Sequence, residues 1–202
     1  MSGFASYVLQ ELQNIPKVKV PVLKADPENF AEYGNFVQNF DQEVVEIVPW
    51  NVSGSRKLMP GTGCGGTVIE DKFEFWIDDD KFTRAHNLAV GCDPYITGLV
   101  SGGSIFTREA NYHPDGGQVF YPTEEIPFYL LLAKKGDDIK ATDFVCFYFN
   151  GECGCQIKPG IWHQPPYLVE KTTFRGKQGA VHACIGYDSV DEEGLLLEIE
   201  LI

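Results

Sequence analysis

The stretch Glu109-Ala-Asn-Tyr-His113-Pro-Asp-Gly-Gly-Gln118 combines a polar strand with a turn that ends it. Alternate residues of a strand share one face, so Glu109, Asn111 and His113 should point to the same side. The Pro-Asp-Gly-Gly run at 114–117 is a turn signal, and Gln118 begins the returning strand. The stretch therefore predicts a β-hairpin that carries a carboxylate, two amides and an imidazole.

A second polar stretch, Lys158-Pro-Gly-Ile-Trp162-His163-Gln-Pro, supplies a lysine and another histidine. Small β-barrels place a few polar groups at the mouth, while the rest of the interior stays apolar. The two stretches predict such a mouth.

The rest of the chain has the pattern of many short strands. Phe128–Ala133 and Phe144–Phe149 are continuous apolar runs, as expected for strands covered on both faces. Short helices are predicted at 3–13 and at 27–33, and the Gly-, Pro- and Ser-rich stretch 50–66 is a long loop that could act as a lid. The predicted fold is an all-β jelly roll. Its strands are expected at 43–48, 66–69, 72–77, 104–113, 117–121, 127–133, 143–149, 154–158, 166–170, 180–187 and 195–201.

Composition restricts the partners. The 202 residues carry a formal net charge of −13, which argues against nucleic acid or an anionic membrane as the main partner. A small anionic substrate is still compatible, because a pocket can be locally positive. No signal peptide and no membrane span is visible. The six cysteines are therefore interpreted as free thiols in a reducing compartment, the cytoplasm.

The polar stretches resemble the motifs of cupins. The cupin pattern of two spaced ligands, a third after about four residues and a late histidine maps onto Asn111, His113, Gln118 and His163. Two of these four positions are amides. The resemblance implies an all-β, cupin-type double-stranded β-helix (a jelly-roll barrel) with short N-terminal helices. Residues 1–40 would form an arm packed on a barrel of residues 41–202.

Within the cupins, the chain resembles the ureidoglycolate lyase family, also called ureidoglycolate hydrolase. The matching segments are Glu109–Gln118 with Val119-Phe-Tyr-Pro122, and Gly160-Ile-Trp-His-Gln-Pro165. The resemblance is firm over about residues 104–170. It implies a homodimeric carbon–nitrogen lyase that splits ureidoglycolate into glyoxylate and urea in purine (allantoin) catabolism.

Roles follow for individual residues as hypotheses. His163 or His113 would transfer protons, because histidine titrates near neutral pH. Lys158 would bind the substrate carboxylate, and Glu109 would orient the reacting groups. Gln118, Asn111 and Trp162 would contact the substrate. His113, Gln118 and His163 could also hold a divalent metal ion, although an amide oxygen is a weak ligand.

Plainer interpretations stay open for the same residues. Glu109 and Lys158 could form an ion pair without a catalytic task, Lys158 could be solvated, and the amides could only satisfy one another inside the barrel. Because fold does not fix function, two alternatives remain. One is another cupin isomerase or hydrolase that acts on a small sugar acid or hydroxy acid. The other is a non-catalytic, ligand-binding cupin.

Overall fold

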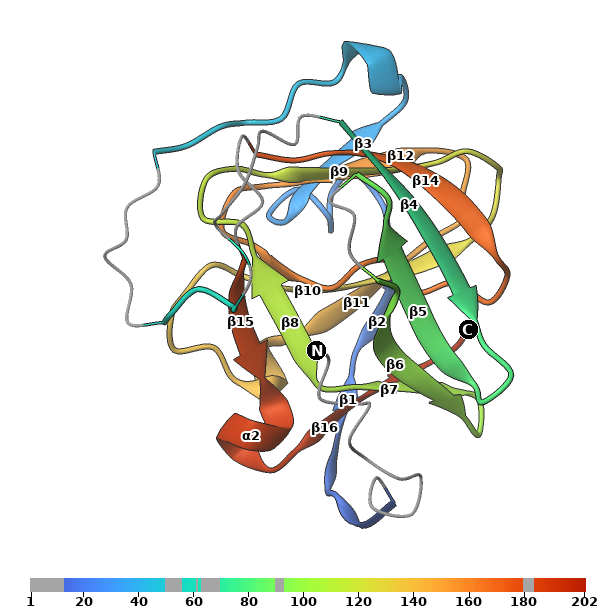
Figure 1. The fold of residues 1–202 in the computed structure, drawn as a ribbon, viewed down its shortest axis with the longest axis vertical. Helices are drawn as coiled ribbons and strands as arrows, with labels where there is room; N and C mark the ends of the chain where they lie inside the picture. The colour runs from blue at the N-terminus through green and yellow to red at the C-terminus, as the bar shows by residue number, and fades with distance from the viewer. Residues whose placement is uncertain (1–12, 50–55, 61, 63–69, 90–92, 180–183) are drawn as a thin grey trace.

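The computed structural model describes residues 13–49, 56–60, 62, 70–89, 93–179 and 184–202, and its regular structure is almost entirely β (Figure 1). The short helical segments are η2 (Phe40–Gln42), η3 (Ala141–Asp143) and α2 (Ser189–Glu193). The strands are β1 (Lys17–Val20), β2 (Val22–Lys24), β3 (Gly34–Val37), β4 (Glu70–Ile77), β5 (Phe82–Asn87), β6 (Tyr95–Ser101), β7 (Ser104–Thr107), β8 (Glu109–Tyr112), β9 (Gln118–Pro122), β10 (Phe128–Ala133), β11 (Val145–Phe149), β12 (Gly154–Ile157), β13 (Trp162–His163), β14 (Thr172–Lys177), β15 (Ile185–Asp188) and β16 (Leu196–Glu200).

The strands form two sheets. The large sheet has ten strands in the order β1-β16-β7-β6-β5-β4-β14-β9-β12-β3, and the small sheet has six in the order β15-β8-β13-β10-β11-β2. In Figure 1, β9, β12 and β14 of the large sheet lie across the molecule from β10 and β11 of the small sheet. The arrangement confirms the predicted all-β, cupin-type barrel.

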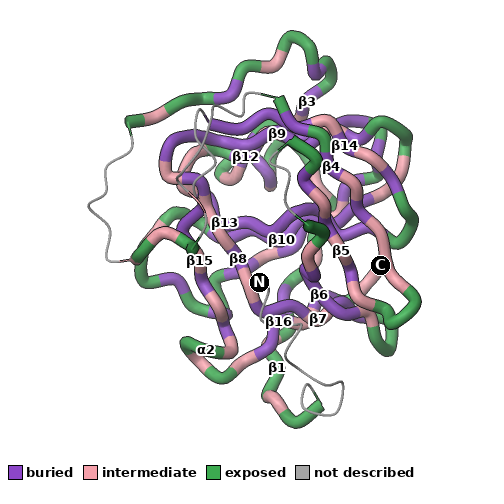
Figure 2. The backbone as a smooth tube through the Cα atoms, in the orientation of Figure 1, coloured by how far each residue is buried: buried purple, intermediate pink, exposed green. Residues whose placement is uncertain are grey.

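Strand β10 is the centre of the apolar core. All six of its residues are buried (Figure 2), which confirms that the run Phe128–Ala133 is covered on both faces. Phe128, Leu130 and Leu132 pack with aromatic side chains of β4, β9 and β14. The alternating residues 129, 131 and 133 pack on the other side with residues of β16. The small sheet therefore separates two apolar layers, and the layer that it shares with β4, β9 and β14 contains the polar residues of interest.

The predicted strand 104–113 is two strands in different sheets. β7 pairs with β16 in the large sheet, and β8 pairs with β15 in the small sheet. Arg108 lies between them, 2% exposed, and its guanidinium contacts Asp188 at 2.6 Å and Asp191 at 2.5 Å. The buried cation fixes the point at which the chain crosses from one sheet to the other. Of the other predicted strands, 43–48 and 166–170 are reduced to isolated bridges at Ile47 and Tyr167.

The predicted N-terminal helices are not part of the described structure. The first, 3–13, lies almost wholly outside the described residues. Residues 27–33 form hydrogen-bonded turns, although the Asp26 carboxylate caps them by accepting from the amides of Glu28 and Asn29, both at 2.8 Å. Gly34 then enters β3, where a Cβ atom would lie 2.0 Å from the Gln156 carbonyl oxygen. This close pairing with β12 ends the turns before a helix can continue.

The N-terminal segment supplies edge strands to both sheets. β1 pairs with β16 and β3 with β12 in the large sheet, while β2 pairs with β11 in the small sheet. Among the described residues, no helix is both long and apolar enough to cross a membrane. The four described cysteines, Cys146, Cys153, Cys155 and Cys184, are free and buried, and Cys64 and Cys92 lie outside the described residues.

Candidate functional site

The polar residues meet where β8, β13 and β9 come together. His163 of β13 pairs with Asn111 of β8 and with Leu132 of β10, so these three side chains share the face that looks toward the large sheet. Gln118 begins β9 and pairs with Ile157, a member of the same interior layer. Strand alternation thus directs imidazole and amide groups into an otherwise aromatic interior.

The turn at 114–117 is held by close backbone packing. The amide of Gly117 donates to the carbonyl of Glu46 at 3.0 Å, and the amide of Val48 donates to the carbonyl of Asp115 at 2.9 Å. A Cβ atom on Gly117 would lie 2.3 Å from the Ile157 carbonyl oxygen. Glycine is therefore required for β9 to start beside β12 and for Gln118 to reach the histidines.

His113, Gln118 and His163 form a hydrogen-bonded trio. Gln118 Oε1 lies 3.0 Å from His113 Nε2 and 2.8 Å from His163 Nε2, and the two rings are 5.2 Å apart between centroids. All three side chains are buried, with 3 to 4% exposure. One amide thus bridges two imidazoles, and the geometry determines their tautomers.

The tautomer of His163 follows from its other nitrogen. Nδ1 lies 2.9 Å from the carbonyl oxygen of Ile161, which can only accept, so Nδ1 carries the proton and Nε2 presents a lone pair. An amide oxygen cannot donate to that lone pair, whereas the two N–H bonds of the amide can donate to both rings. We therefore assign Gln118 with its NH₂ group toward the imidazoles. His113 then has its proton on Nδ1, which faces the Cys184 sulfur at 3.7 Å.

Burial keeps His163 uncharged. The pKa of His163 is lowered from 6.5 to about 3, mainly by desolvation and secondarily by the charge of His113, while the hydrogen bond to Ile161 opposes the shift. A protonated imidazole would lose its hydration without gaining a carboxylate partner. His163 is thus suited to accept hydrogen bonds rather than to hold a second proton.

The described residues of the long loop, 56–60 and 62, contact the backbone of Cys184, whose sulfur faces His113. The amide of Met59 donates to the carbonyl of Cys184 at 2.8 Å, and the amide of Cys184 donates to the Thr62 hydroxyl at 3.0 Å. Arg56 anchors this segment, because its guanidinium nitrogens donate to both carboxylate oxygens of Glu192 at 2.7 and 2.8 Å. The guanidinium also lies 5.3 Å from the centroid of the Trp162 ring. The described part of this loop is therefore fixed to β15 and to α2.

The other predicted site residues are placed differently. Trp162 is the neighbour of His163 in β13 and so faces the opposite layer, where its Nε1 donates to the Gly136 carbonyl at 2.8 Å. Lys158 is exposed and its ammonium donates to the Ala31 carbonyl at 2.5 Å. Glu109 is half-buried, and its carbonyl accepts from the Gln164 side chain. The trio thus comprises His113, Gln118 and His163, while Lys158 and Trp162 lie outside it.

Sequence reasoning missed a second polar group on the facing sheet. Asp71 of β4 is 6% exposed, and its Oδ2 accepts from Gln178 Nε2 at 2.5 Å. Burial raises its pKa from 3.8 to about 6, against the lowering effects of Asn87, His113 and Gln178. The signal that could have found it is alternation, because Asp71 is in phase with the inward-facing Phe73 and Phe75.

The trio fits a divalent metal ion only in part. Two Nε2 lone pairs converge, but the third donor is an amide, a weak ligand, and divalent sites usually include a carboxylate, a thiolate or a third imidazole. Among the described residues, no group of three or more His, Cys, Asp or Glu side chains is arranged to hold an ion. Metal binding stays a prediction, and the proposed reaction does not depend on a metal ion.

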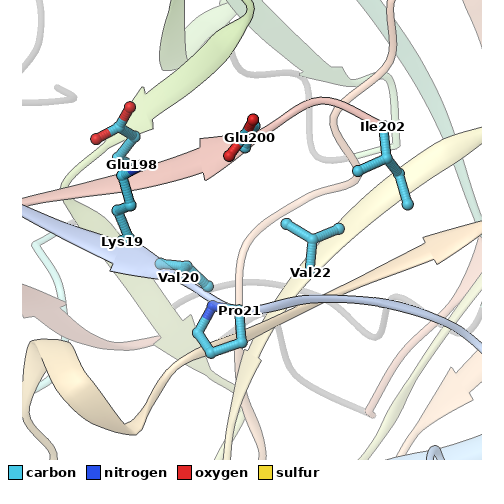
Figure 3. A pocket seen from close by; sticks show the side chains of 7 residues that line it. All are labelled: Lys19, Val20, Pro21, Val22, Glu198, Glu200 and Ile202. Carbon is cyan, nitrogen blue, oxygen red and sulfur yellow. The ribbon is translucent and has the colours of Figure 1, made fainter.

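A separate surface cavity of about 280 Å³ lies where β1, β2 and β16 meet (Figure 3). Its charged lining consists of Glu198, Glu200 and a single cation, Lys19. Two carboxylates disfavour an anionic ligand there. The interior trio is therefore the better candidate for chemistry on a small acid.

The fold is a cupin-type barrel with a pair of imidazoles in its interior. The ureidoglycolate lyase family model matches residues 104–178, which include β8, β9, β13 and the whole trio. A ureidoglycolate lyase of Pseudomonas savastanoi pv. phaseolicola is 36% identical over 120 residues, covering 52% of this chain and 69% of the relative. The ureidoglycolate lyase of Stutzerimonas stutzeri is 29% identical over 150 residues, covering 66% and 86%. The chain belongs to the ureidoglycolate lyase family.

Proposed function

We propose that this protein is a lyase that cleaves ureidoglycolate into glyoxylate and urea. The observation that carries the proposal is the trio of His113, Gln118 and His163 in the segment that matches the family. The two relatives described above are both named ureidoglycolate lyase, which supports the same substrate. The place of the reaction would be purine (allantoin) catabolism.

The reaction needs a base for the hydroxyl proton of ureidoglycolate. His113 can supply it through Nε2, the lone pair that faces Gln118, once the substrate hydroxyl takes the place of that amide hydrogen bond. The O–H electrons then form the aldehyde C=O bond as the C–N bond to urea breaks. His163 stays neutral and, with Gln118, orients the substrate and the base.

The remaining roles are extensions of the proposal. Lys158 would bind the substrate carboxylate after leaving its present partner, the Ala31 carbonyl. Glu109 and Asn111 would complete the surroundings of the substrate, while Trp162, which faces the opposite layer, would act only by holding β13 in place. If a divalent ion is bound, His113, Gln118 and His163 would hold it, and it would stabilise negative charge on the substrate.

The protein would act as a cytoplasmic homodimer, and the free thiols Cys146, Cys153, Cys155 and Cys184 support a reducing compartment.

The direct test is glyoxylate release from ureidoglycolate by the purified protein, with and without added divalent metal. His113→Ala removes the proposed base and should lower turnover by about a hundred- to ten-thousand-fold, the range that proton-transfer groups contribute, and His163→Ala should lower turnover through the loss of a positioning group. His86→Ala is the matched control, because His86 is a half-exposed histidine on β5, outside the trio. Full activity in a folded His163→Ala variant would reject the site assignment. Absence of glyoxylate from the wild-type protein, together with turnover of a sugar acid, would favour the alternative cupin enzymes.

A further inference from the structure

The side chain of Asp71 lies on the inward-facing side of β4, in the same large sheet that carries Gln118 on β9. It lies in β4 opposite Gly176 of β14, where a Cβ atom would be only 3.1 Å from the Asp71 Cβ. The missing side chain at 176 leaves room for the carboxyl group. On its other side Gly176 pairs with Phe120 of β9, two residues from Gln118, so the strand register brings Asp71 toward the trio, and the charge of His113 lowers the pKa of Asp71.

The hydrogen bonds of this carboxyl group are incomplete. Oδ2 accepts from Gln178, and the side chain also interacts with Asn87. Oδ1 is buried and has no hydrogen-bond partner among the described residues. A buried polar atom without a partner is destabilising, so it calls for an explanation. A buried carboxyl oxygen without a partner, on the inward-facing side of β4, is suited to exchange a proton with a bound molecule.

We propose that Asp71 is a further catalytic residue, the acid that protonates the leaving urea nitrogen. The inference rests on the proposed lyase activity and supplies its second proton-transfer group. His113 takes the hydroxyl proton, the C–N bond breaks with its electron pair on nitrogen, and Oδ1 of protonated Asp71 gives that nitrogen a proton. The proton on His113 then passes to the Asp71 carboxylate, and both groups return to their starting states.

The buried position of Asp71 suits a residue that must donate a proton. Burial disfavours the charged carboxylate and raises the pKa to about 6, so a useful fraction of the carboxyl is protonated near neutral pH. His163 cannot be the acid, because it stays neutral over the same range. The trio alone thus offers one proton-transfer group, and Asp71 offers the other.

The test is Asp71→Asn, which keeps the shape of the side chain and removes the exchangeable proton. Glu74→Gln is the matched control, because Glu74 is a partly exposed carboxylate on the same strand, beside His86 on the outer face. Initial rates with ureidoglycolate and urea unfolding are measured for both variants. Asp71→Asn should lower kcat about a hundredfold or more with little change in KM. Its unfolding midpoint should be equal to or higher than that of the wild type, while Glu74→Gln changes neither.

Three outcomes would overturn the inference. Wild-type kcat in a folded Asp71→Asn variant removes the acid role and leaves the proposed lyase function intact. A loss of activity that follows a lower unfolding midpoint makes Asp71 a structural residue. A wild-type protein that releases no glyoxylate overturns the proposed function, and this inference with it.

Discussion

Because His163 stays neutral in the folded protein, its contribution to the free energy of unfolding should fall when the pH is lowered from about 8 to about 5. The unfolded histidine has a pKa of 6.5 and takes up a proton over this range, whereas the buried folded histidine, with a pKa of about 3, does not. The unfolded state is thus stabilised relative to the folded state as the pH falls. Over the 1.5 units between 6.5 and about 5, this lowers the free energy of unfolding by about 2 kcal/mol.

Asp71 has the opposite effect over the same range. Its folded pKa, about 6, lies above the unfolded value of 3.8, so the folded state binds the proton more readily. Above about pH 6 the buried charge of Asp71 therefore lowers the free energy of unfolding. This effect is lost as the pH falls and the carboxylate is protonated. Between about pH 8 and about pH 5, the protonation raises the free energy of unfolding by about 1 to 1.5 kcal/mol. In the wild-type protein the Asp71 effect offsets part of the His163 effect, and a net loss of about 0.5 to 1 kcal/mol remains.

Single variants separate the two contributions. Urea unfolding at both pH values, followed by tryptophan fluorescence, gives the free energy of unfolding of the wild type, His163→Gln and Asp71→Asn. On lowering the pH, His163→Gln should gain stability relative to the wild type by about 2 kcal/mol, and Asp71→Asn should lose about 1 to 1.5 kcal/mol relative to it. An identical pH dependence in the wild type and His163→Gln would refute the buried, neutral histidine.

Two further substitutions and a thiol count test other features. Lys158→Met should raise KM for ureidoglycolate and leave kcat nearly unchanged, and an unchanged KM in steady-state assays would remove Lys158 from carboxylate binding. Gly117→Ala should lower the free energy of unfolding by about 1 to 3 kcal/mol, because its Cβ would meet the Ile157 carbonyl. Gly136→Ala, whose Cβ meets only the Asp138 side chain at 3.4 Å, is the control, and equal stability of the two variants would contradict the packing argument. Six thiols should react in denaturant, whereas a count of two or fewer would indicate disulfides.

The architecture was predictable from local patterns, and the crossings between sheets were not. The apolar run Phe128–Ala133 marks a strand covered on both faces whatever its partners are. Arg108 gives no such signal, because the ion pairs that fix it involve Asp188 and Asp191, far along the chain. Residues 27–33 carry a proper helix cap, but pairing of Gly34 with β12 overrides that local preference.

In the candidate site, too, local sequence patterns reveal some residues, and only the three-dimensional fold reveals the others. His113, Gln118 and His163 were found from the spacing of their residue types in two short stretches. Asp71 lies outside both stretches, and only the pairing of β4 with β14 and of β14 with β9 brings it toward the trio. The exposed position of Lys158 depends in the same way on its contact with Ala31, which no local pattern encodes.

The parallel pairing of β1 with β16 has a consequence for synthesis on the ribosome. Lys17 aligns with Leu196, so β1 emerges long before the strand that holds it in the large sheet. Until then its main-chain amides and carbonyls on that side have no strand partner, and unpaired strand edges favour association between chains. Premature termination before β16 would leave β1 unpaired and the buried side chains of Leu197 and Ile199 missing from the core. Nascent chains stalled in this region should therefore be strong clients for chaperones.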